Sequence, residues 1–457
     1  MGEYKSMVEA PTGWLGSIPE HWECKKIGSL FSERKTKVSD ADYSPLSVTK
    51  LGIVPQLANA AKSDSGDNRK LVCSGDFVIN SRSDRKGSCG VSELDGSVSL
   101  INIVLTPRNS WDNKYVHYLM RSQPFSEEYY HYGRGIVADL WTTRYSEMKN
   151  ILLPVPPHDE QEQIVRFLDW KVSGINKLIN IKKKEIESLC ELRNSTIDSG
   201  ILHGFHHGDM KSSGIYWLGD IPSTWEVMPI KRVAKINASV ADIVKVLDDE
   251  ELLTFLPMEN VSERGEIDCS IKRPLKEIKS GYSSFAKGDV VVAKITPCFE
   301  NGKGACLDTL DTEIGFGTTE FINLRPGDEI LSRYLYMITM TQHFRKLGER
   351  VMTGSAGQKR ISANYIKNFT LGIPVIKEQE EILKKLDSTL SKIDELIEIK
   401  KSEISGLHEL KNRLISDVVT GNIDVCDIEI PEYEFTDESA DSDLGDVDFD
   451  VDEEQED

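Results

Sequence analysis

Trp14-Leu-Gly-Ser-Ile-Pro-Glu-His-Trp22 recurs as Trp217-Leu-Gly-Asp-Ile-Pro-Ser-Thr-Trp225, at an offset of 203 residues. Three later blocks recur in the same order, so chance identity does not explain them. The offset changes only between blocks, which places insertions in loops and keeps a common framework. A period this long indicates two whole domains rather than a solenoid of short repeats. The later pairs are Gly75-Asp-Phe-Val-Ile with Gly288-Asp-Val-Val-Val, Tyr115, Phe125 and Gly135 with Tyr334, Phe344 and Gly354, and Glu160-Gln-Glu-Gln-Ile164 with Glu378-Gln-Glu-Glu-Ile382.

The first part of each repeat is a stretch of mixed character, long enough for an independent domain. Short β-rich runs at residues 76–80 and 289–293 are bounded by Gly and Asp, which are turn signals. One helical stretch follows in each copy, near Lys114–Tyr129 and Leu331–Leu347. These patterns predict an α+β head in each repeat.

The second part of each repeat is a long helix that begins after a proline stop. Its apolar residues recur at steps of three and four, which is the spacing of a coiled-coil seam. Roughly 40 residues at about 1.5 Å per residue predict a rod on the order of 60 Å. The predicted seam runs through Ile164, Leu168, Val172, Ile175, Ile179, Lys182, Ile186, Leu189 and Leu192, and through Ile382, Leu386, Leu390, Ile393, Ile397, Lys400, Ile404, Leu407 and Leu410.

Lysine stands at the same seam position in both helices, Lys182 and Lys400. A polar seam residue commonly fixes register and partner number at some cost in stability. Because both helices belong to one chain and each follows a head, antiparallel pairing is the simplest arrangement. The alternative is that each helix packs only on its own head.

The predicted fold class is therefore α+β, with two pseudo-symmetric α/β domains joined by two long antiparallel helices that form a coiled coil. The boundaries that we predict are 1–154 for the first domain, 155–203 for the central helix, 204–374 for the second domain, 375–421 for the C-terminal helix and 422–457 for an acidic, disordered tail.

The formal charge of −20 is concentrated in that tail. Between Asp427 and Asp457 there are 16 acidic residues and neither Lys nor Arg, which leaves about −4 for residues 1–426. Such a stretch is typical of a solvated, disordered appendage. The net charge therefore does not exclude a local basic face on the heads, and it does not favour one.

The eight cysteines contain no CxxC pair, which argues against a disulfide framework and a structural zinc site. No run of about 18 apolar residues could span a bilayer, and the N-terminus lacks the pattern of a secretory signal. These features favour the cytoplasm and no membrane partner.

Motifs for catalysis are missing from the sequence. It has no Asn/Asp-Pro-Pro-Tyr/Phe, GxGxxG or GxxxxGK[ST] motif, so neither an amino-methyltransferase nor a nucleotide site is indicated. Carboxylate–lysine sets could be assembled from Asp289 with Lys294, or from Asp394, Glu398 and Lys400, but a turn and a solvated helix face explain them better. The histidines at 203, 206 and 207 lie in a Gly-rich junction without a nearby Cys, and we expect no metal there.

Two related but non-identical heads on a rigid spacer suit the reading of two short elements a fixed distance apart. A rod on the order of 60 Å would separate the heads by between one and two turns of B-DNA, at about 34 Å a turn. Reading a DNA sequence needs Arg, Lys, Asn and Gln side chains for base edges, and further Lys and Arg for phosphates. Two corresponding pairs of stretches supply them: the segments 133–144 and 354–360, and the loops after the Gly-Asp strands. The copies differ most in these loops, as expected if they read different bases. The candidate DNA-binding residues are Arg82, Arg85, Lys86, Arg134 and Arg144 in the first head, and Lys294, Lys303, Gln358, Lys359 and Arg360 in the second.

The Trp-Leu-Gly-x-Ile-Pro-x-x-Trp opening, the proline stops and the Glu-Gln-Glu-x-Ile helix start resemble those of type I restriction-modification specificity subunits, over residues 10–425. The resemblance implies two target recognition domains that read a bipartite, asymmetric site in double-stranded DNA, with the helices as a ruler. It also implies two modification subunits that methylate adenine, and restriction subunits that translocate and cleave DNA. No cofactor is then expected on this chain, because S-adenosylmethionine, ATP and Mg²⁺ would bind the partner subunits.

Two alternatives remain at this point. The chain could be a non-catalytic scaffold whose coiled coil assembles partners, with DNA binding incidental. It could also be a regulator of such a complex, in which the acidic tail mimics DNA and blocks the heads.

Overall fold

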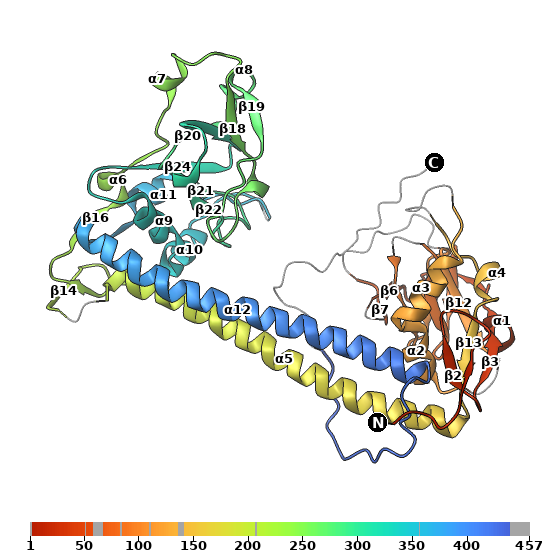
Figure 1. Cartoon of the computed structure of the whole chain (residues 1–457). Coiled ribbons are helices and arrows are strands. Elements are labelled where there is room, and N and C mark those ends of the chain that lie inside the picture. The colour runs from red at the N-terminus through yellow and green to blue at the C-terminus, as the bar shows by residue number, and fades with distance from the viewer. Residues whose placement is uncertain are drawn as a thin grey trace. The chain divides into compact units, whose positions relative to one another are not determined.

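The computed structural model describes residues 2–50, 52–57, 67–82, 85–108, 111–135, 141–205, 208–355 and 357–438. The chain divides into two compact units. Unit 1 comprises residues 1–184 and 401–457, and unit 2 comprises residues 185–400. Each unit therefore combines one head with half of each long helix, whereas the sequence-based boundaries set the helices apart from the heads. The long helices are α5 (His158–His203) and α12 (Ile376–Val419) (Figure 1).

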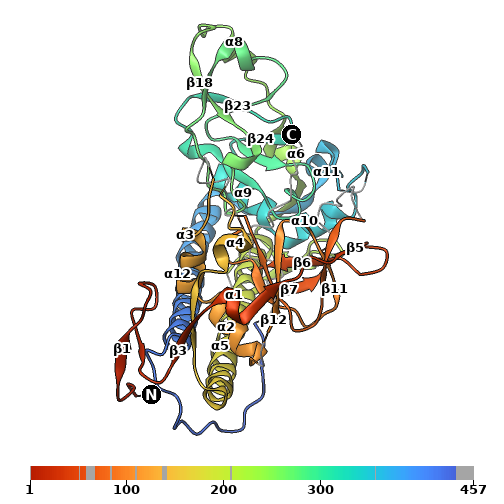
Figure 2. The same cartoon turned by 90° about the vertical axis from the view of Figure 1, so that its right-hand side faces the viewer.

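The first head is built on a four-stranded antiparallel sheet in the order β10-β9-β12-β4. A second sheet, β11-β8-β5, and the β6-β7 hairpin lie close to it (Figure 2). The hairpin β1-β2 and the pair β3-β13 complete the head. The strands are β1 (Met7–Glu9), β2 (Ser17–Pro19), β3 (Glu23–Lys26), β4 (Phe31–Glu33), β5 (Lys37–Val38), β6 (Leu46–Thr49), β7 (Gly52–Pro55), β8 (Arg69–Val72), β9 (Phe77–Asn80), β10 (Cys89–Val91), β11 (Gly96–Val98), β12 (Asn102–Pro107) and β13 (Leu152–Val155).

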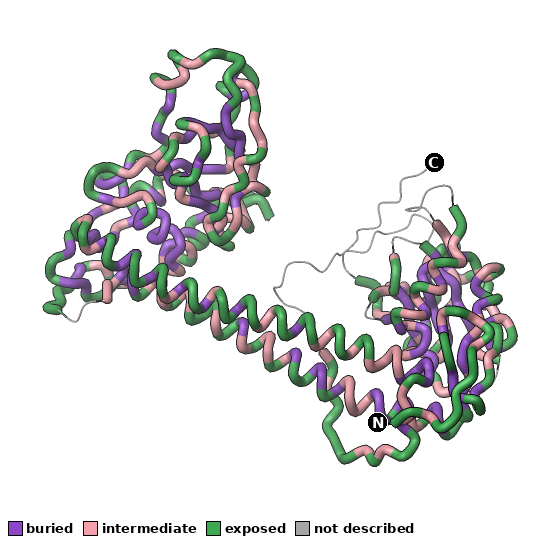
Figure 3. Tube along the Cα trace, viewed as in Figure 1, coloured by how far each residue is buried: buried purple, intermediate pink, exposed green. Residues whose placement is uncertain are grey.

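The second head repeats this plan, with a central antiparallel sheet in the order β22-β21-β24-β17. Its second sheet is larger, β19-β18-β23-β20, and its β18 and β23 are parallel. In each unit the buried segments are concentrated in the central strands and the helices against them (Figure 3). The strands are β14 (Met210–Ser212), β15 (Asp220–Pro222), β16 (Glu226–Pro229), β17 (Ala234–Ile236), β18 (Leu252–Leu256), β19 (Lys272–Pro274), β20 (Ser283–Ala286), β21 (Val290–Ala293), β22 (Gly304–Cys306), β23 (Ile314–Gly317), β24 (Phe321–Pro326) and β25 (Thr370–Ile373).

The single helical stretch that the sequence predicts in each head is in fact two helices. The breaks fall at Ser122 and Thr341, equivalent positions with extended backbone. Ser122 Oγ donates to Leu119 O at 2.7 Å and Thr341 Oγ1 to Ile338 O at 2.8 Å, so each hydroxyl takes a carbonyl that a continuing helix would use. The helices of the heads are α1 (Ile27–Leu30), α2 (Asn113–Arg121), α3 (Gln123–His131), α4 (Tyr145–Met148), α6 (Ile230–Val233), α7 (Ala241–Val244), α8 (Leu275–Ile278), α9 (Ser332–Met340), α10 (Gln342–Glu349), α11 (Ala363–Asn368) and the 3₁₀ turns η3 (Met258–Asn260) and η4 (Leu307–Thr309).

The repeated tryptophan and glutamate motifs meet in each unit. Trp22 Nε1 donates to Glu160 Oε1 at 3.0 Å, and Trp225 Nε1 donates to Glu378 Oε1 at 2.8 Å. Glu160 is buried, and a buried carboxylate requires donors of this kind. The opening motif of each head is thereby tied to the first turn of its long helix.

The repeated glutamine of Glu-Gln-Glu joins three segments in each unit. Gln161 Nε2 donates to Pro156 O, and Gln379 Nε2 donates to Pro374 O, both at 2.9 Å. Their Oε1 atoms accept from the backbone N–H of Asp112 at 3.2 Å and of Leu331 at 2.9 Å. The proline stop, the long helix and the start of α2 or α9 are therefore held together by one side chain.

The repeated tyrosines join each head to the end of the long helix that follows the other head. Tyr115 Oη donates to Val419 O at 3.3 Å within unit 1, and Tyr334 Oη donates to Ile201 O at 3.1 Å within unit 2. Both rings are fully buried. The repeated residues thus fix both long helices to the head in each unit.

The two long helices run antiparallel within each unit. In unit 1 Lys411 Nζ donates to Asn176 Oδ1 at 3.2 Å, and Lys182 lies 2.9 Å from Glu403. In unit 2 Lys400 lies 3.0 Å from Glu185, and Arg193 lies 3.0 Å from Asp394. Residue numbers rise along α5 while those of its partners in α12 fall, which defines an antiparallel pair.

Most predicted seam positions are buried between the helices or against the heads, but Leu192 and Leu410 are 53% and 54% exposed. The prediction is wrong for these two residues, because a helix of 3.6 residues per turn drifts by about 20° per heptad away from a strict seven-residue repeat. Val172, Leu189 and Leu407 are partly buried, as are Lys182 and Lys400. The buried positions are Ile164, Leu168, Ile175, Ile179, Ile186, Ile382, Leu386, Leu390, Ile393, Ile397 and Ile404.

The first part of the tail differs from the expectation of disorder. Residues 422–438 are placed against unit 1, with Val425 fully buried and Ile428 packed on the core of the first head. Asp424 forms a backbone bridge with Gly2. The disorder prediction is wrong for this segment because its apolar residues at every second or third position give it a surface to bury. Residues 439–457 lie outside the described part.

Candidate nucleic-acid interface

In the first head, the two candidate DNA-contacting stretches come together through backbone pairing. Thr142 bridges both Arg82 and Arg134. The Arg134 N–H donates to Thr142 O at 3.2 Å, the return bond is 3.0 Å, and the Thr143 N–H donates to Ser81 O at 2.9 Å. The loop after the Gly-Asp strand and the segment after α3 therefore form one edge, which we call basic edge 1 (Arg82, Arg85, Lys86, Arg134 and Arg144).

The second head contains the same arrangement at equivalent positions. Arg360 bridges both Ile295 and Thr353. The Thr353 N–H donates to Arg360 O at 3.1 Å, and the Ile361 N–H donates to Lys294 O at 2.8 Å. The repeat offsets of 213, 218 and 219 carry Arg82, Thr142 and Arg134 onto Ile295, Arg360 and Thr353. We call this basic edge 2 (Lys294, Lys303, Gln358, Lys359 and Arg360).

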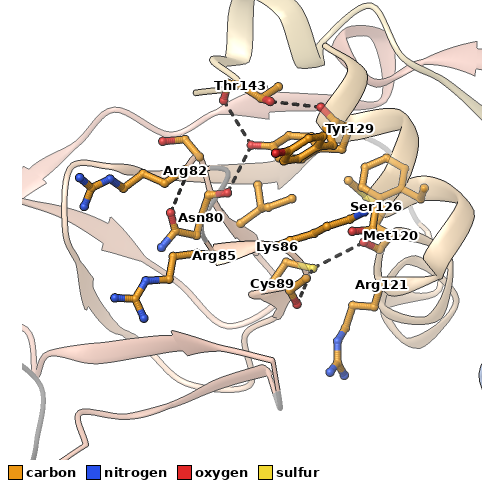
Figure 4. Close-up of a pocket in the computed structure, with 15 residues that line it drawn as sticks. Asn80, Arg82, Arg85, Lys86, Cys89, Met120, Arg121, Ser126, Tyr129 and Thr143 are labelled. Atoms are coloured by element: carbon orange, nitrogen blue, oxygen red, sulfur yellow. Dashed lines mark hydrogen bonds between the residues drawn. The ribbon is translucent and has the colours of Figure 1, made fainter. Parts of the chain in front are cut away.

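Basic edge 1 borders a small hollow of about 20 Å³, room for a single water. Arg82 and Arg85 point in one direction, away from Tyr129 (Figure 4). Asn80 Oδ1 accepts from the Arg82 N–H at 3.0 Å, which fixes the backbone at the start of the loop. Lys86 Nζ lies 5.3 Å from the centre of the Tyr130 ring, a cation–π contact. No carboxylate lies among the described residues that line this hollow.

Basic edge 2 borders a larger, open hollow of about 630 Å³ lined by serine, threonine and asparagine side chains together with Lys294 and Arg360. The Arg360 guanidinium is bound by Glu320, with 3.0 Å from Nη2 to Oε1 and 3.0 Å from Nε to Oε2. These hydrogen bonds raise the pKa of Arg360. The carboxylate of Glu320 therefore stands where an anionic ligand of Arg360 would bind.

The predicted residues differ in exposure. Arg82, Lys86, Arg134, Arg144, Gln358, Lys359 and Arg360 are exposed, whereas Arg85, Lys294 and Lys303 are partly buried. Lys303 joins basic edge 2 through its backbone, since its carbonyl accepts from the Ala293 N–H at 2.9 Å. Exposed cationic side chains on a backbone-braced edge can reach phosphates and base edges.

Sequence reasoning missed Asn80, Tyr130 and Glu320, which shape these edges. The repeat alignment could have found the bridges, because it carries Thr142 onto Arg360. Nothing in the sequence pairs Glu320 with Arg360, which lie 40 positions apart and meet only in the folded head.

The speculative carboxylate–lysine sets have structural roles. Asp289 is 1% exposed and binds Arg325 through two hydrogen bonds of 2.8 Å, rather than facing Lys294. Asp394 binds Arg193, and Lys400 binds Glu185. Neither set forms a cluster for metal-assisted chemistry.

His203 Nδ1 lies 3.1 Å from Asp220 O, whereas His206 and His207 lie outside the described residues. In the part of the chain that the structure describes, no group of three His, Cys, Asp or Glu residues is placed to hold a metal ion. A search over the same residues found no helix of the length and apolar character needed to cross a bilayer.

Residues 222–406 match the family model for the type I restriction modification DNA specificity domain. The chain is 37% identical over 199 residues to the type I restriction enzyme EcoAI specificity subunit of Escherichia coli, covering 43% of this chain and 33% of that protein. The match thus spans one third of the length of this relative. The chain is also 22% identical over 457 residues to the putative type I restriction enzyme MjaX specificity subunit of Methanocaldococcus jannaschii. That match covers 90% of this chain and 96% of the relative.

A solved structure from a study of the assembly and conformational transition of the type I R-M system has the same fold, with a TM-score of 0.61 at 14% identity over 89% of this chain and 99% of that one. The family match lies in unit 2 except for its last residues, 401–406, which are in the middle of α12, and the internal repeat extends the same plan to unit 1. Residues 222–406 are thus similar to the DNA specificity domain of type I restriction-modification systems, and the fold of the chain is similar to that of the solved structure.

Proposed function

We propose that this chain is the non-catalytic subunit that reads DNA sequence for a type I restriction-modification complex, with one head for each half of a bipartite, asymmetric site. It directs methylation and cleavage that partner subunits carry out. The cofactors of that chemistry, S-adenosylmethionine, ATP and Mg²⁺, bind the partners in this proposal.

The observation that carries the proposal is the pair of basic edges. Both heads use the same backbone bridges to present different side chains, with Arg82 and Arg134 in one and Lys359 and Arg360 in the other. Two heads that read different half-sites require the same backbone framework with different hydrogen-bond donors on it. A duplicated enzyme would instead be expected to repeat its reactive groups.

The long helices support a ruler function. They contain 46 and 44 residues, which at about 1.5 Å per residue gives each a length of roughly 65–70 Å. Each head is fixed to one long helix by its Trp–Glu hydrogen bond and to the other by Tyr115 or Tyr334. A change in helix length would therefore be transmitted to the spacing of the half-sites.

Two matched surfaces support the binding of two copies of one modification subunit. In unit 1 Leu178, Ile181 and Leu410 are 44–54% exposed. Their repeat equivalents in unit 2, Leu396, Ile399 and Leu192, are 45–53% exposed. We call these apolar clusters 1 and 2. Exposed apolar side chains that share one helix face mark docking sites when they form a patch, and Leu178 and Ile181, three residues apart, share a face of α5, as Leu396 and Ile399 share one of α12.

The decisive experiment begins with methylome sequencing of cells with and without this chain, which identifies the site. The chain is then mixed with its modification subunit, and binding to that duplex is measured by fluorescence anisotropy. We expect Arg134→Ala to relax the base requirement in one half-site only. Lys359→Ala should relax the base requirement in the other half-site if Lys359 contacts a base, and should only reduce the salt dependence of binding if it contacts a phosphate.

Lys245→Ala is the control, because this lysine is exposed at the C-cap of α7 in the second head and belongs to neither edge. A complex with no preference for any DNA sequence would contradict the recognition proposal. The chain would then be better described as a non-catalytic scaffold. A preference that depends on neither edge would contradict our placement of the interface.

The DNA-mimic alternative is not favoured by the described part of the tail. The side chains that bind the carbonyls of residues 425–437 belong to α5, and none comes from basic edge 1. Deleting residues 427–457 should therefore leave DNA affinity unchanged at fixed salt. A clear rise in affinity would restore the mimic function.

A further inference from the structure

The C-terminal segment of unit 1 is held along α5 through its backbone carbonyls. Gln163 Nε2 donates to Val425 O at 3.0 Å and to Ile428 O at 2.9 Å. Ser173 Oγ donates to Glu434 O at 3.1 Å and accepts from the Thr436 N–H at 2.8 Å. Further along, Asn176 Nδ2 donates to Thr436 O at 3.2 Å, and Asn180 Nδ2 donates to Asp437 O at 2.8 Å.

The last described residue of the segment, Glu438, has a carboxylate that three basic side chains surround. Glu438 lies 3.3 Å from Lys183 Nζ on α5, and 2.8 Å from His408 Nε2 and 2.6 Å from Lys411 Nζ on α12. Burial would raise the pKa of Glu438, but the hydrogen bonds and charges of Lys411 and His408 outweigh it and lower this pKa to about 2. Glu438 is therefore a charged anchor at the far end of the segment.

The other acidic side chains of the segment do not take part in this binding. Asp427, Glu429, Glu432, Glu434 and Asp437 are exposed. Since the carbonyls carry no sequence information, the donor row on α5 recognises an extended backbone, and the basic residues add recognition of one correctly placed carboxylate.

Unit 2 provides an internal comparison, because the 218-residue offset maps each contact residue onto a counterpart. Asn176 and Asn180 correspond to Asp394 and Glu398, whose ionised carboxylates accept hydrogen bonds but donate none. The full set Gln163, Ser173, Asn176, Asn180, Lys183, His408 and Lys411 corresponds to Glu381, Ser391, Asp394, Glu398, Lys401, Cys190 and Arg193. The amide donors of Gln163, Asn176 and Asn180 are thus particular to unit 1, whereas the equivalents of Ser173, Lys183 and Lys411 can also donate.

We propose that unit 1 contains a peptide-binding groove for an extended segment with an acidic anchor, formed by Ser173, Asn176 and Asn180 of α5 with Lys183, His408 and Lys411 around the anchor. This chain's own residues 431–438 fill the groove reversibly. In unit 1 a row of donors lies opposite an extended backbone, and two of these donors, Asn176 and Asn180, are replaced in unit 2 by the acceptors Asp394 and Glu398. This difference supports a built site in unit 1.

The groove lies on the opposite side of α5 from apolar cluster 1. At 100° per residue, the mean direction of Asn176 and Asn180 lies about 150° from the mean direction of Leu178 and Ile181. Filling the groove therefore leaves apolar cluster 1 open for a partner. This inference does not depend on DNA recognition, and it can fail or hold independently of the proposed function.

The first test follows release of the segment in the full chain. A glutamate-specific protease cleaves after Glu432 and Glu434, and mass spectrometry gives the rate at these two bonds. We expect the double variant Asn176→Asp/Asn180→Glu, which installs the residues of unit 2, to be cleaved at least tenfold faster than the wild type. Circular dichroism checks that the helices are retained.

The matched control makes the reverse change in unit 2, Asp394→Asn/Glu398→Asn, and should leave the cleavage rate unchanged. The inference is overturned if the wild-type segment is cleaved as fast as a free peptide of residues 427–442. It is also overturned if both double variants accelerate cleavage equally, since a general loosening of the coil would do that.

The second test supplies the segment in trans. A fluorescent peptide of residues 429–438 is titrated with the full chain and with its Glu438→Gln variant, in which the chain's own anchor is weakened. We expect at least tenfold tighter binding to the variant, and at least tenfold weaker binding of a peptide carrying the same change. Equal binding of the two peptides, or none to either chain, would exclude a reversible groove.

Discussion

Asp76 and Asp289 stand at equivalent positions after a glycine turn and are 2% and 1% exposed. Each binds a single arginine through two hydrogen bonds, Arg34 in the first head at 2.8 and 3.0 Å and Arg325 in the second at 2.8 Å. Arg34 comes directly after β4, whereas Arg325 belongs to β24. The buried carboxylate is repeated but the strand that supplies its partner is not, which marks a structural ion pair.

We expect Asp289→Ala to lower the free energy of unfolding by about 2–4 kcal/mol, because it leaves the partly buried Arg325 without its carboxylate. Urea unfolding followed by circular dichroism measures the change. Asp242→Ala is the control, since its ion pair with Lys245 is exposed and should contribute nothing measurable. Equal effects of the two changes would refute the structural role.

Glu320 is the residue on which the charge of basic edge 2 depends. Its carboxylate binds Arg360 and competes with any phosphate. We expect Glu320→Gln to raise the affinity for any duplex by about 3- to 10-fold at low salt, and to steepen the salt dependence by about one phosphate contact. Anisotropy titrations over a salt series measure both, and an unchanged slope would show that Arg360 does not face DNA.

At the scale of the helices, Lys182 and Lys400 interrupt an otherwise apolar seam. Each ammonium pairs with a glutamate of the other helix, Glu403 or Glu185, and the two ion pairs are equivalents at the repeat offset of 218. They are half-exposed, so their contribution to stability is small. The two lysines instead fix the register of the two helices, since an apolar side chain at this position would tolerate a shifted pairing of α5 with α12.

We expect Lys182→Leu/Lys400→Leu to raise the free energy of unfolding by about 1 kcal/mol per site through added apolar burial. Light scattering should then detect a fraction of intermolecular dimers, because the register is less well specified. Lys177→Leu is the control on the exposed face of α5 and should change neither quantity. Lower stability of the double variant would show that the ion pairs matter more than the seam.

The docked C-terminal segment should depend on pH through Glu438. Docking lowers the pKa of this carboxyl from its ordinary 4.5 to about 2. The resulting stabilisation is therefore complete above pH 4.5 and is lost as the pH falls toward 2. A nitroxide at Glu432→Cys, with the exposed Cys190 and Cys426 changed to serine, should gain mobility over this range.

The matched Glu438→Gln chain controls for the pH measurement. Its segment should be mobile already at pH 7, with no further transition between pH 4.5 and 2. If instead the wild-type and variant chains follow the same pH curve, Glu438 is not the anchor.

At the scale of the whole molecule, the predicted quantity is the spacing between half-sites. One heptad inserted after Lys184 and another after Lys400, where the two units divide, should preserve the seam. Because seven residues add about 10 Å of helix and one base pair spans about 3.4 Å, we expect the recognised spacer to lengthen by about three base pairs. Methylome sequencing reads the new spacer.

An insertion in α5 alone is the control for this experiment. It should abolish recognition, because the antiparallel partners would lose their register. If the paired insertion leaves the spacer length unchanged, the helices do not act as a ruler.

The sequence by itself determined the plan of this protein. Duplicated motifs defined two heads, and apolar periodicity defined two long helices, because burial at a regular spacing is a local property of the chain. The bridges of the basic edges, the Trp–Glu and Tyr–carbonyl links and the Arg360–Glu320 pair were decided only by the tertiary structure. They join residues separated by 40 or more positions in sequence, or by loops whose path no periodic pattern specifies.

The C-terminal tail shows most clearly the difference between what the sequence determines and what the tertiary structure decides. Its composition predicted disorder, since between Asp427 and Asp457 acidic residues outnumber apolar ones and there is neither Lys nor Arg. Composition counts side chains, however, whereas residues 425–437 are bound through backbone carbonyls that every sequence possesses. The donors that meet them lie on α5, more than 250 positions away, and only the folded coil brings them into one row.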